Sequence, residues 1–312
     1  MQQTINTILM VRPVNFRMNQ QTAVNNYYQQ EIQHMLPAAI NRKAQLEFDE
    51  LVVKLKEKGV DVLVIDDTVD PSTPDSIFPN NWISFHENGD VALYPLFAEN
   101  RRGERREDVL DYLEEKGFVI ENIVDYSDAE IEEIYLEGTG SMVLDRKNRK
   151  AYCALSPRSD EELFIEYCED FEYTPVIFTA NQTVNEKREA IYHTNVMMSV
   201  AEKYVIVCLE AIDDKKERKN VLKHLKADGK EVIAISEKQL NAFVGNMLQV
   251  RGAKNQLFMV MSTAAFHSLQ KDQLSKIEKY NQIIHSSLET IETCGGGSAR
   301  CMMAELFIPK IN

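Results

Sequence analysis

The chain has 312 residues, enough to bury a sizeable hydrophobic core in one large domain or in two. Its 49 acidic against 35 basic side chains give a formal charge of −14, which argues against nucleic acid or an anionic membrane as its main partner. Five scattered cysteines without a Cys-x-x-Cys pair indicate a reducing compartment, and neither a disulfide framework nor a zinc site. No apolar run approaches the roughly 18 residues of a membrane span, so we expect a cytoplasmic protein.

The predicted elements repeat one order along the chain. Residues 5–11 read as a strand, 38–58 as a helix ended by a glycine, and 61–65 as a second strand. Four units of strand, strand, helix and strand follow, with their elements at 81–85, 91–96, 104–116 and 118–124; at 141–144, 151–155, a helix from Ser159 and 174–179; at 193–200, 204–209, 213–228 and 231–235; and at 246–251, 256–261, 264–286 and 288–292. Ser159 and Glu162 resemble a capping box at one of these helix starts.

The remaining segments supply a fifth unit if a strand at 301–308 pairs with the strand at 5–11, so that a ring closes across the two termini. The units start at Asn81, Gly140, His193, Asn246 and Cys301, which gives steps of 59, 53, 53 and 55 residues. A nearly constant step without sequence identity is typical of a fold-level repeat whose units cannot bury their own apolar faces. We therefore predict a single domain over residues 1–312.

If the units are related by rotation, the residues that begin the first strands converge on one central cavity. They form a chemical set: Asn81 with Asp75 upstream, Glu137, His193 with Asn195 on the same strand face, and Cys301. A thiol nucleophile, an imidazole acid or base and a carboxylate are the groups needed to hydrolyse a carbon that bears nitrogen leaving groups.

Each residue also has an ordinary interpretation. His193 by itself is more often a buried histidine with satisfied hydrogen bonds, Glu137 a carboxylate at a helix end, and Asn81 a turn residue. Cys301 follows three glycines that predict a flexible loop delivering it to the start of a strand, yet a buried structural cysteine fits that loop equally well. Their common place in the repeat favours the catalytic interpretation.

Three motifs carry a resemblance to a known family: Leu136-Glu137-Gly138-Thr139-Gly140, His193-Thr194-Asn195 and the run from Gly295 to Met302. Together they resemble the amidinotransferase superfamily, or penteins, whose fold is a five-bladed α/β propeller of pseudo-fivefold ββαβ repeats. Within it, Met10-Val-Arg-Pro13 and the segment 74–82 are similar to the bacterial citrulline-utilisation hydrolase branch.

The resemblance implies that Cys301 is the nucleophile, His193 the general acid and base, and Glu137 its carboxylate partner. Arg158 matches the arginine that holds the α-carboxylate of the substrate in relatives. A second arginine from Arg101, Arg102 or Arg105 could assist, but we expect these three at a solvated helix start. No metal and no organic cofactor is implied.

One departure from the family pattern bears on the substrate. Deiminases of the superfamily usually carry aspartates where this chain has Asn81 and Asn195. An amide can donate to a carbonyl oxygen as well as accept from N–H, so it suits a neutral ureido group better than a carboxylate does.

The sequence therefore predicts a hydrolase of citrulline, or of arginine through citrulline, that yields ornithine, ammonia and carbon dioxide through an S-linked intermediate. The partner is a small amino acid, with neither nucleic acid nor membrane; the sequence leaves a homo-oligomer open. Alternatives are an arginine deiminase, a dimethylarginine hydrolase or an amidinotransferase acting on a guanidine. A non-catalytic ribosome-binding factor of the same fold is a further alternative, which the acidic charge disfavours.

Overall fold

The computed structural model, which describes residues 2–311, contains five three-stranded sheets that share one strand arrangement. In each sheet the middle strand is antiparallel to one neighbour and parallel to the other. The sheets are β17 (Ala304–Glu305), β1 (Thr7–Arg12) and β2 (Asp61–Asp66); β3 (Ile83–Phe85), β4 (Asp90–Leu93) and β5 (Asn122–Asp125); β6 (Met142–Asp145), β7 (Lys150–Leu155) and β8 (Thr174–Thr179); β11 (Met198–Val200), β12 (Tyr204–Val207) and β13 (Glu231–Ala234); and β14 (Leu248–Arg251), β15 (Leu257–Ser262) and β16 (Gln282–Ser286).

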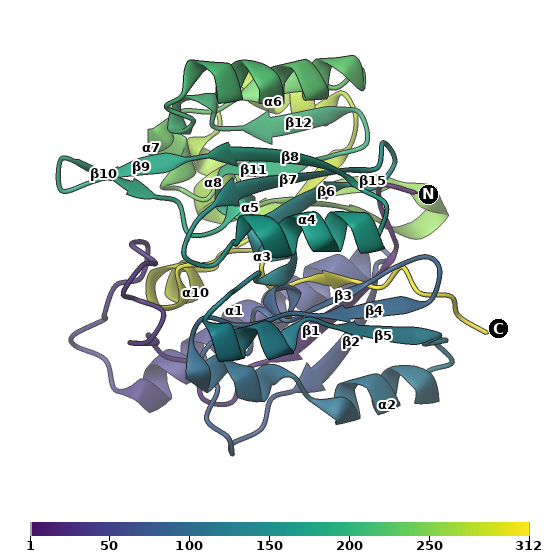
Figure 1. Cartoon of the computed structure of the whole chain (residues 1–312). Coiled ribbons are helices and arrows are strands. Elements are labelled where there is room, and N and C mark those ends of the chain that lie inside the picture. Colours follow the sequence, from purple (N-terminus) through teal and green to yellow (C-terminus); the bar gives the residue numbers. More distant parts are fainter. Residues whose placement is uncertain (1, 312) are drawn as a thin grey trace.

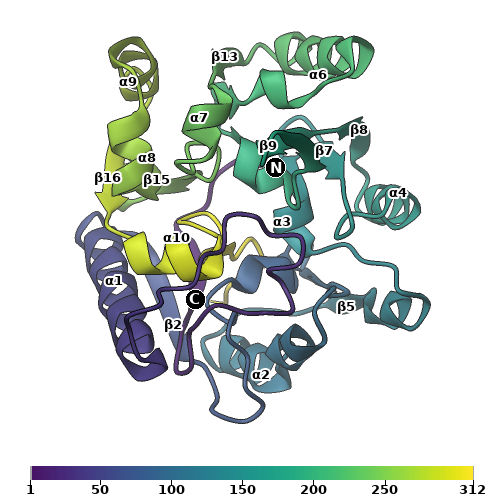
Figure 2. The same cartoon turned by 90° about the vertical axis from the view of Figure 1, so that its left-hand side faces the viewer.

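The parallel neighbours are joined by helices, because a parallel connection needs a crossover. Figure 2 shows these crossover helices around the outside of the molecule. They are α1 (Pro37–Glu57), α2 (Glu107–Glu115), α4 (Glu161–Asp170), α6 (Lys215–Ala227), and the pair α8 (Thr263–Ser268) and α9 (Lys271–Glu278). The short helices α3 (Gly138–Ser141), α5 (Thr194–Met197), α7 (Glu237–Leu240) and α10 (Glu289–Gly295) lie elsewhere, as do 3₁₀ turns at Pro79–Asn81, Glu99–Glu104, Ser127–Glu132, Leu209–Ala211 and Ala253–Asn255.

The fifth unit closes across the termini, as the sequence predicts. Strand β17 pairs antiparallel with β1 through Ile8 and Glu305, and β1 pairs parallel with β2 along its whole length. The purple N-terminal strand and the yellow C-terminal segment accordingly lie side by side in Figure 1. The repeat of strand, strand, helix and strand is thus confirmed in all five units.

Helix α1 illustrates how the crossover helices bury one face. Its buried residues Ile40, Ala44, Phe48, Leu51 and Leu55 recur every three or four positions, which places them on one side of the helix. They belong to the same apolar cluster as residues of β1 and α10. The packing of α1 therefore joins the N-terminal unit to the helix that precedes Cys301.

The chain between 180 and 200 differs from its prediction. A hairpin of β9 (Asn181–Val184) and β10 (Lys187–Ala190) comes first, and His193 then caps the one-turn helix α5 before β11 begins. The hairpin residues are mostly polar, so they lack the alternating apolar pattern that predicts strands. The four residues of α5 are too few to show the periodicity of a helix. His193 and Asn195 therefore do not share a strand face, and that part of the prediction is wrong.

The C-terminal region differs too. The predicted helix at 264–286 ends earlier, because β16 occupies its last part, and the strand expected at 288–292 is helix α10. Cys301 lies in a turn before β17 and not at the first position of a strand. The short apolar run at 288–292 allowed either element, which is the usual ambiguity for a segment of this length.

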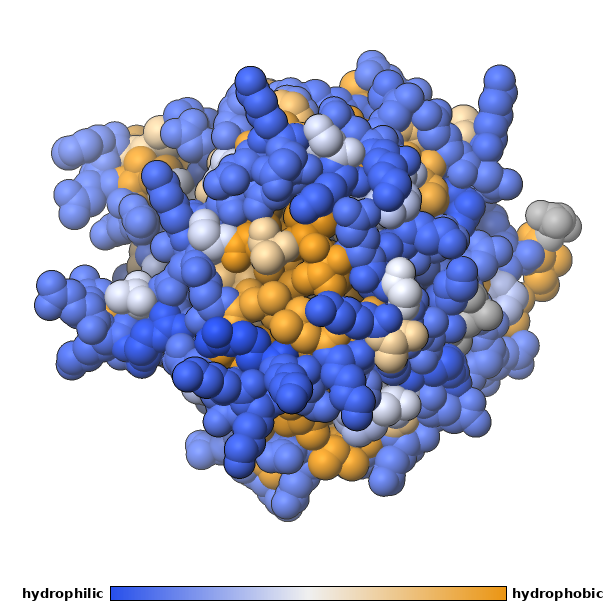
Figure 3. All heavy atoms as spheres, turned by 90° about the horizontal axis from the view of Figure 1, so that it is seen from above, coloured by the Kyte–Doolittle hydropathy of each residue, from blue (hydrophilic) through white to orange (hydrophobic). Residues whose placement is uncertain are grey.

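None of the helices within residues 2–311 is both long and apolar enough to cross a membrane. The face of the molecule in Figure 3 is mostly hydrophilic, with an apolar patch near its centre.

The start of α4 provides a test of the local structure. The predicted cap at Ser159 is wrong, because Asp160 is the capping residue and accepts a hydrogen bond from Leu163 N at 3.0 Å. Asp160→Ala should lower the free energy of unfolding by about 1 kcal/mol in urea denaturation. Glu162→Ala, which would break a capping box at Ser159, should change it by about 0.5 kcal/mol or less. The reverse order of the two variants would contradict this assignment.

Candidate active site

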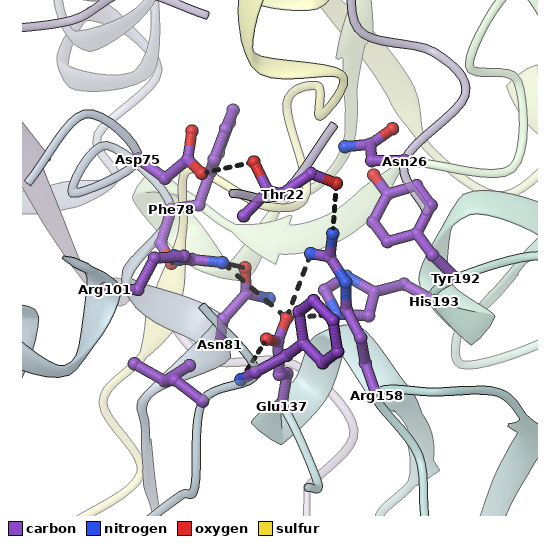
Figure 4. Close-up of polar contacts among 12 residues, drawn as sticks. Thr22, Asn26, Asp75, Phe78, Asn81, Arg101, Glu137, Arg158, Tyr192 and His193 are labelled. Carbon is purple, nitrogen blue, oxygen red and sulfur yellow. Dashed lines mark hydrogen bonds and ion pairs between the residues drawn. The ribbon is translucent and has the colours of Figure 1, made fainter. Parts of the chain in front are cut away.

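A small cavity lies where turns from several units meet. Three of its lining residues come from turns that precede a first strand: Asn81 before β3, His193 before β11 and Cys301 before β17. Figure 4 shows the polar side chains converging on this space. The full lining is Thr22, Asn26, Asp75, Phe78, Asn81, Arg101, Arg158, Tyr192, His193, Gly295, Gly297 and Cys301.

Glu137 lies directly behind His193 and is fully buried. Its Oε2 is 2.7 Å from His193 Nε2, and its Oε1 accepts a hydrogen bond from Phe97 N at 3.0 Å. Burial by itself raises the pKa of Glu137, but the charge of Arg158, the hydrogen bond with His193 and the charge of Arg101 hold it well below its usual range. The carboxylate is therefore ionised and can only accept hydrogen bonds.

His193 is neutral at physiological pH. Burial lowers its pKa to about 4, and the neighbouring Glu137, which raises it, does not compensate. Because the ionised Glu137 can only accept, the imidazole hydrogen is on Nε2 and Nδ1 is left as an acceptor. A Cβ on Gly140 would come within 2.8 Å of that Nδ1 and within 2.4 Å of Asn81 Nδ2, so the Gly-Thr-Gly motif leaves room for both side chains.

Cys301 is only 2% exposed, and two amides contact its sulfur. Asn246 Nδ2 donates to Sγ at 3.1 Å, while Asn195 lies beside it with Nδ2 at 3.5 Å and Oδ1 at 3.7 Å. Burial raises the pKa of Cys301, although the hydrogen bond from Asn246 lowers it in part. The free protein therefore holds a neutral thiol and a neutral imidazole in the lining of one cavity.

The glycine loop before Cys301 is packed and buried, contrary to the flexible loop expected. A Cβ on Gly295 or on Gly297 would come within 2.8 or 2.9 Å of the Phe78 ring. Gly296 ends α10 in the left-handed region, with φ of 63°, and its carbonyl accepts a hydrogen bond from Tyr192 at 2.5 Å. The glycines thus allow the loop to approach the pocket wall closely.

Two buried guanidinium groups line the pocket. Arg101 donates through Nη1 to Asn81 Oδ1 at 2.9 Å and holds Glu104 through Nε and Nη2, each at 2.9 Å. It is 2% exposed, so the solvated helix start expected for this residue is wrong. Arg102 and Arg105 point elsewhere and pair with Glu130 at 3.2 and 2.6 Å.

Arg158 also lies inside the pocket and not at its rim, at 1% exposed. It reaches Glu137 at 3.4 Å, Thr22 O at 2.8 Å and Asn25 Oδ1 at 2.9 and 2.5 Å. The N-terminal loop that carries Thr22 and Asn25 therefore covers this guanidinium, and Figure 4 shows the contact with Thr22.

Asp75 brings a carboxylate to the same pocket. Its Oδ2 accepts hydrogen bonds from Asn19 at 2.8 Å and from Thr22 at 3.0 Å. Its Oδ1 is buried without a hydrogen-bond partner among residues 2–311. Burial raises the pKa of Asp75, and Arg101 acts in the opposite direction.

The structure thus gathers most of the residues that the sequence selects. Cys301, His193, Asn81, Asp75 and Arg158 line one cavity, and Glu137 supports the imidazole from behind. In the described part of the chain no group of three or more His, Cys, Asp or Glu side chains is placed to hold a metal ion.

The structure differs from the predicted set of pocket residues at two asparagines, Asn195 and Asn246. Asn195 contacts the Cys301 sulfur but lines a different cavity, because the helical turn of α5 rotates it away from His193. Asn246 was not selected from the sequence, yet its contact with that sulfur, at 3.1 Å, is shorter than those of Asn195. The signal was present, since Asn246 begins a unit at the position equivalent to Asn81 and His193.

Glu292 in α10 supports the cysteine loop and provides a pH test. It is 8% exposed and accepts a hydrogen bond from Ser298 Oγ at 2.6 Å. Burial raises its pKa to about 7. Between pH 4.5 and 7 the folded protein holds a proton at Glu292 that the unfolded chain releases, so this residue makes stability fall as pH rises through that window.

Glu292→Gln should remove this part of the pH dependence. The free energy of unfolding of the variant, relative to the natural chain, should rise by roughly 1–3 kcal/mol from pH 5 to pH 8. Glu289→Gln, an exposed position of the same helix, serves as the control and should leave the profile nearly parallel. Urea denaturation at several pH values measures both, and parallel profiles for Glu292→Gln would contradict the assignment.

Comparison with known proteins now gives three findings. A family model described as "N,N dimethylarginine dimethylhydrolase, eukaryotic" matches residues 12–308. Curated proteins give no match. Among solved structures, ArgZ, described as an arginine dihydrolase from the ornithine-ammonia cycle in Cyanobacteria, aligns with a TM-score of 0.73 at 18% identity, covering 98% of this chain and 41% of ArgZ.

The N-terminal domain of ArgZ by itself aligns over 97% of this chain and 99% of that domain, with a TM-score of 0.73 at 18% identity. That structure is of an asparagine-to-serine variant described as covalently bound to a reaction intermediate. A dimethylarginine dimethylaminohydrolase adduct with S-methyl-L-thiocitrulline aligns with a TM-score of 0.63 at 12% identity, covering 97% of this chain and 100% of that one. At these identities the likeness shows a shared fold.

Proposed function

We propose that this protein hydrolyses a guanidino or ureido amino acid through Cys301. The family model matches residues 12–308, so the chain belongs to the N,N-dimethylarginine dimethylhydrolase family of the amidinotransferase superfamily. The superfamily resemblance and the enzyme class, a hydrolase of C–N bonds, are confirmed at this level. The observation that carries the proposal is the convergence of Cys301 and His193 on one cavity, with Glu137 behind the imidazole at 2.7 Å.

We propose further that the five units form a single five-bladed α/β propeller over residues 1–312, with the cavity near its axis. The support comes from the shared plan of the five sheets and from the pairing of β17 with β1. The crossover helices lie on the outside in Figure 2, and residues from different units meet at the cavity.

The protonation states suit a particular order of proton transfers. His193 Nδ1 accepts the proton of the Cys301 thiol as the sulfur attacks the central carbon of the substrate, and the imidazolium then protonates the departing nitrogen, which leaves as ammonia. In the second half, His193 removes a proton from the attacking water, and the C–S bond breaks to return the thiol. Glu137 stabilises the transient positive charge of the ring.

Arg101 and Arg158 suit the α-carboxylate of an amino-acid substrate. Both guanidinium groups are buried in the pocket, and such groups recognise carboxylates through paired hydrogen bonds. Asn25 Oδ1 now accepts hydrogen bonds from Arg158 Nε and Nη2, as a carboxylate oxygen would. Binding of the substrate at Arg158 therefore requires this amide to be displaced or to share the guanidinium.

The orientation of Asn81 supports a ureido substrate. Its Oδ1 accepts a hydrogen bond from Arg101 at 2.9 Å, so its Nδ2 is the end left to meet a ligand. Among residues 2–311 the one hydrogen bond that Nδ2 donates goes to Asn80 Oδ1 at 3.2 Å. A donor at this place complements the carbonyl oxygen of citrulline. We propose citrulline, or arginine through citrulline, as the substrate, with ornithine, ammonia and carbon dioxide as products. Asn195 does not contribute to this argument, because it lines the other cavity.

A guanidine hydrolase is the second candidate, and Asp75 favours it. The buried Oδ1 of Asp75 has no hydrogen-bond partner in the part of the chain that the structure describes, and it would complement a guanidinium N–H. Incubation with arginine and with citrulline separately, followed by mass spectrometry of the products, distinguishes the two. Ornithine from citrulline supports the first candidate, and citrulline as the final product from arginine supports the second.

Two cysteine variants test the nucleophile. Cys301→Ala should reduce turnover about 10³-fold or more, because the covalent path is lost. Cys294→Ala should retain most of the activity, since Cys294 is a buried residue of α10 outside the pocket. Steady-state release of ammonia measures both. An essential Cys294 with a dispensable Cys301 would overturn the assignment.

Asn81→Asp tests the role of the amide. The change places a carboxylate opposite the ureido oxygen and removes its donor, and an unmade buried hydrogen bond costs about 1–3 kcal/mol. Hydrolysis of citrulline should therefore fall, while a guanidinium gains a charge partner, so citrulline should accumulate from arginine. The measurement is the ratio of ornithine to citrulline formed from arginine. The same ratio in the variant and the natural chain would refute the argument.

A further inference from the structure

A second cavity shares no lining residue with the substrate pocket. Its lining begins with Thr139 in α3 and with Asn195, which contacts the Cys301 sulfur, and extends to Arg146, which follows β6. The four residues of β6 span about 13 Å, so Arg146 lies well away from Glu137, which precedes this strand. Polar and charged side chains take a large part in the lining, among them Arg146, Ser199, Gln249, Arg300 and Glu305.

Arg146 is the unusual member of this set. It is 2% exposed, and its Nη1 has no hydrogen-bond partner among residues 2–311. The other deeply buried arginines of the described chain each hold a carboxylate: Arg101 holds Glu104 at 2.9 Å, Arg158 holds Glu137 at 3.4 Å, and Arg300 holds Glu305 at 2.7 Å. Arg146 instead stacks on the Phe307 ring, 4.1 Å from the guanidinium carbon, and makes a side-chain hydrogen bond with Tyr173.

A buried cation without an acidic partner is costly, because removing it from water is compensated only by paired charges and hydrogen bonds. The cavity also contains a second unsatisfied group, Ser199, whose buried Oγ has no partner within residues 2–311. Burial lowers the pKa of Arg146, while Tyr173 and the charge of Glu305 raise it, and Arg300 holds the same Glu305 carboxylate at 2.7 Å. Two guanidinium groups of the lining therefore share one carboxylate, which leaves one positive charge in excess beside the unpartnered Arg146 Nη1 and Ser199 Oγ.

We propose that this cavity binds a small oxyanion, inorganic phosphate or a short carboxylate, through Arg146 and Ser199. An oxyanion accepts from both groups and supplies the missing negative charge. The site is independent of the proposed hydrolase activity, because none of these residues lines the substrate pocket.

Calorimetric titration with inorganic phosphate, at constant ionic strength, tests the proposal. One saturable site is expected in the natural chain. Arg146→Gln should weaken it about tenfold or more, as expected for the loss of a charge-assisted hydrogen bond. Ser199→Ala, a small change that removes only the hydroxyl, should weaken it roughly threefold or more and keeps the test decisive if Arg146→Gln does not fold.

Arg158→Gln is the matched control, because it removes a buried guanidinium from the substrate pocket. Phosphate binding that survives Arg158→Gln and is lost in Arg146→Gln supports the proposal. Binding lost in Arg158→Gln and retained in Arg146→Gln assigns the anion to the substrate pocket and overturns it. Titration with acetate under the same conditions distinguishes phosphate from a carboxylate as the ligand. If acetate binds, phosphate does not, and the binding requires Arg146, the ligand is a carboxylate. If neither anion gives saturable binding, the proposal is overturned.

Discussion

The buried charge of Glu137 is the constraint around which the pocket is arranged. A carboxylate with no exposed surface is stable only if cations and donors surround it, and here Arg158, Arg101, His193 and Phe97 N fill that role. Each of these groups is thereby fixed in position: the bond to Glu137 leaves Nδ1 as the acceptor nitrogen of the imidazole, and the two guanidinium groups line the same cavity. Loss of this carboxylate would leave two buried cations without their common partner.

The same arrangement explains why the pocket holds its reactive groups in neutral form. Burial raises the pKa of Cys301 and lowers that of His193, so neither charge exists before a substrate arrives. A thiolate and imidazolium pair would have to be stabilised next to Arg158 and Arg101, whose charges oppose the protonation of the ring. The transfer of the thiol proton is thus coupled to the attack itself, and the ionised Glu137 favours the imidazolium that results.

Close packing by glycine brings distant segments together at this place. Gly140 leaves room for His193 and Asn81, while Gly295 and Gly297 let the cysteine loop lie against Phe78. The N-terminal loop then covers Arg158 through Thr22 and Asn25. Residues separated by more than a hundred positions therefore contribute to one small cavity, and its shape depends on the closure of the chain through β1 and β17.

The sequence by itself determined the repeat, the closing strand and most of the pocket, because the periodic order of elements and the unit starts are encoded locally. It identified Cys301, His193, Glu137, Asn81, Asp75 and Arg158, all of which lie in or directly behind the cavity. It did not determine the direction of Asn195 or the burial of Arg101, which depend on two short helical segments, α5 and the 3₁₀ turns at Glu99–Glu104. Only the tertiary structure decided the contact of Asn246 with the sulfur and the place of Arg146, whose Nη1 has no hydrogen-bond partner among residues 2–311, because packing between units positions these side chains.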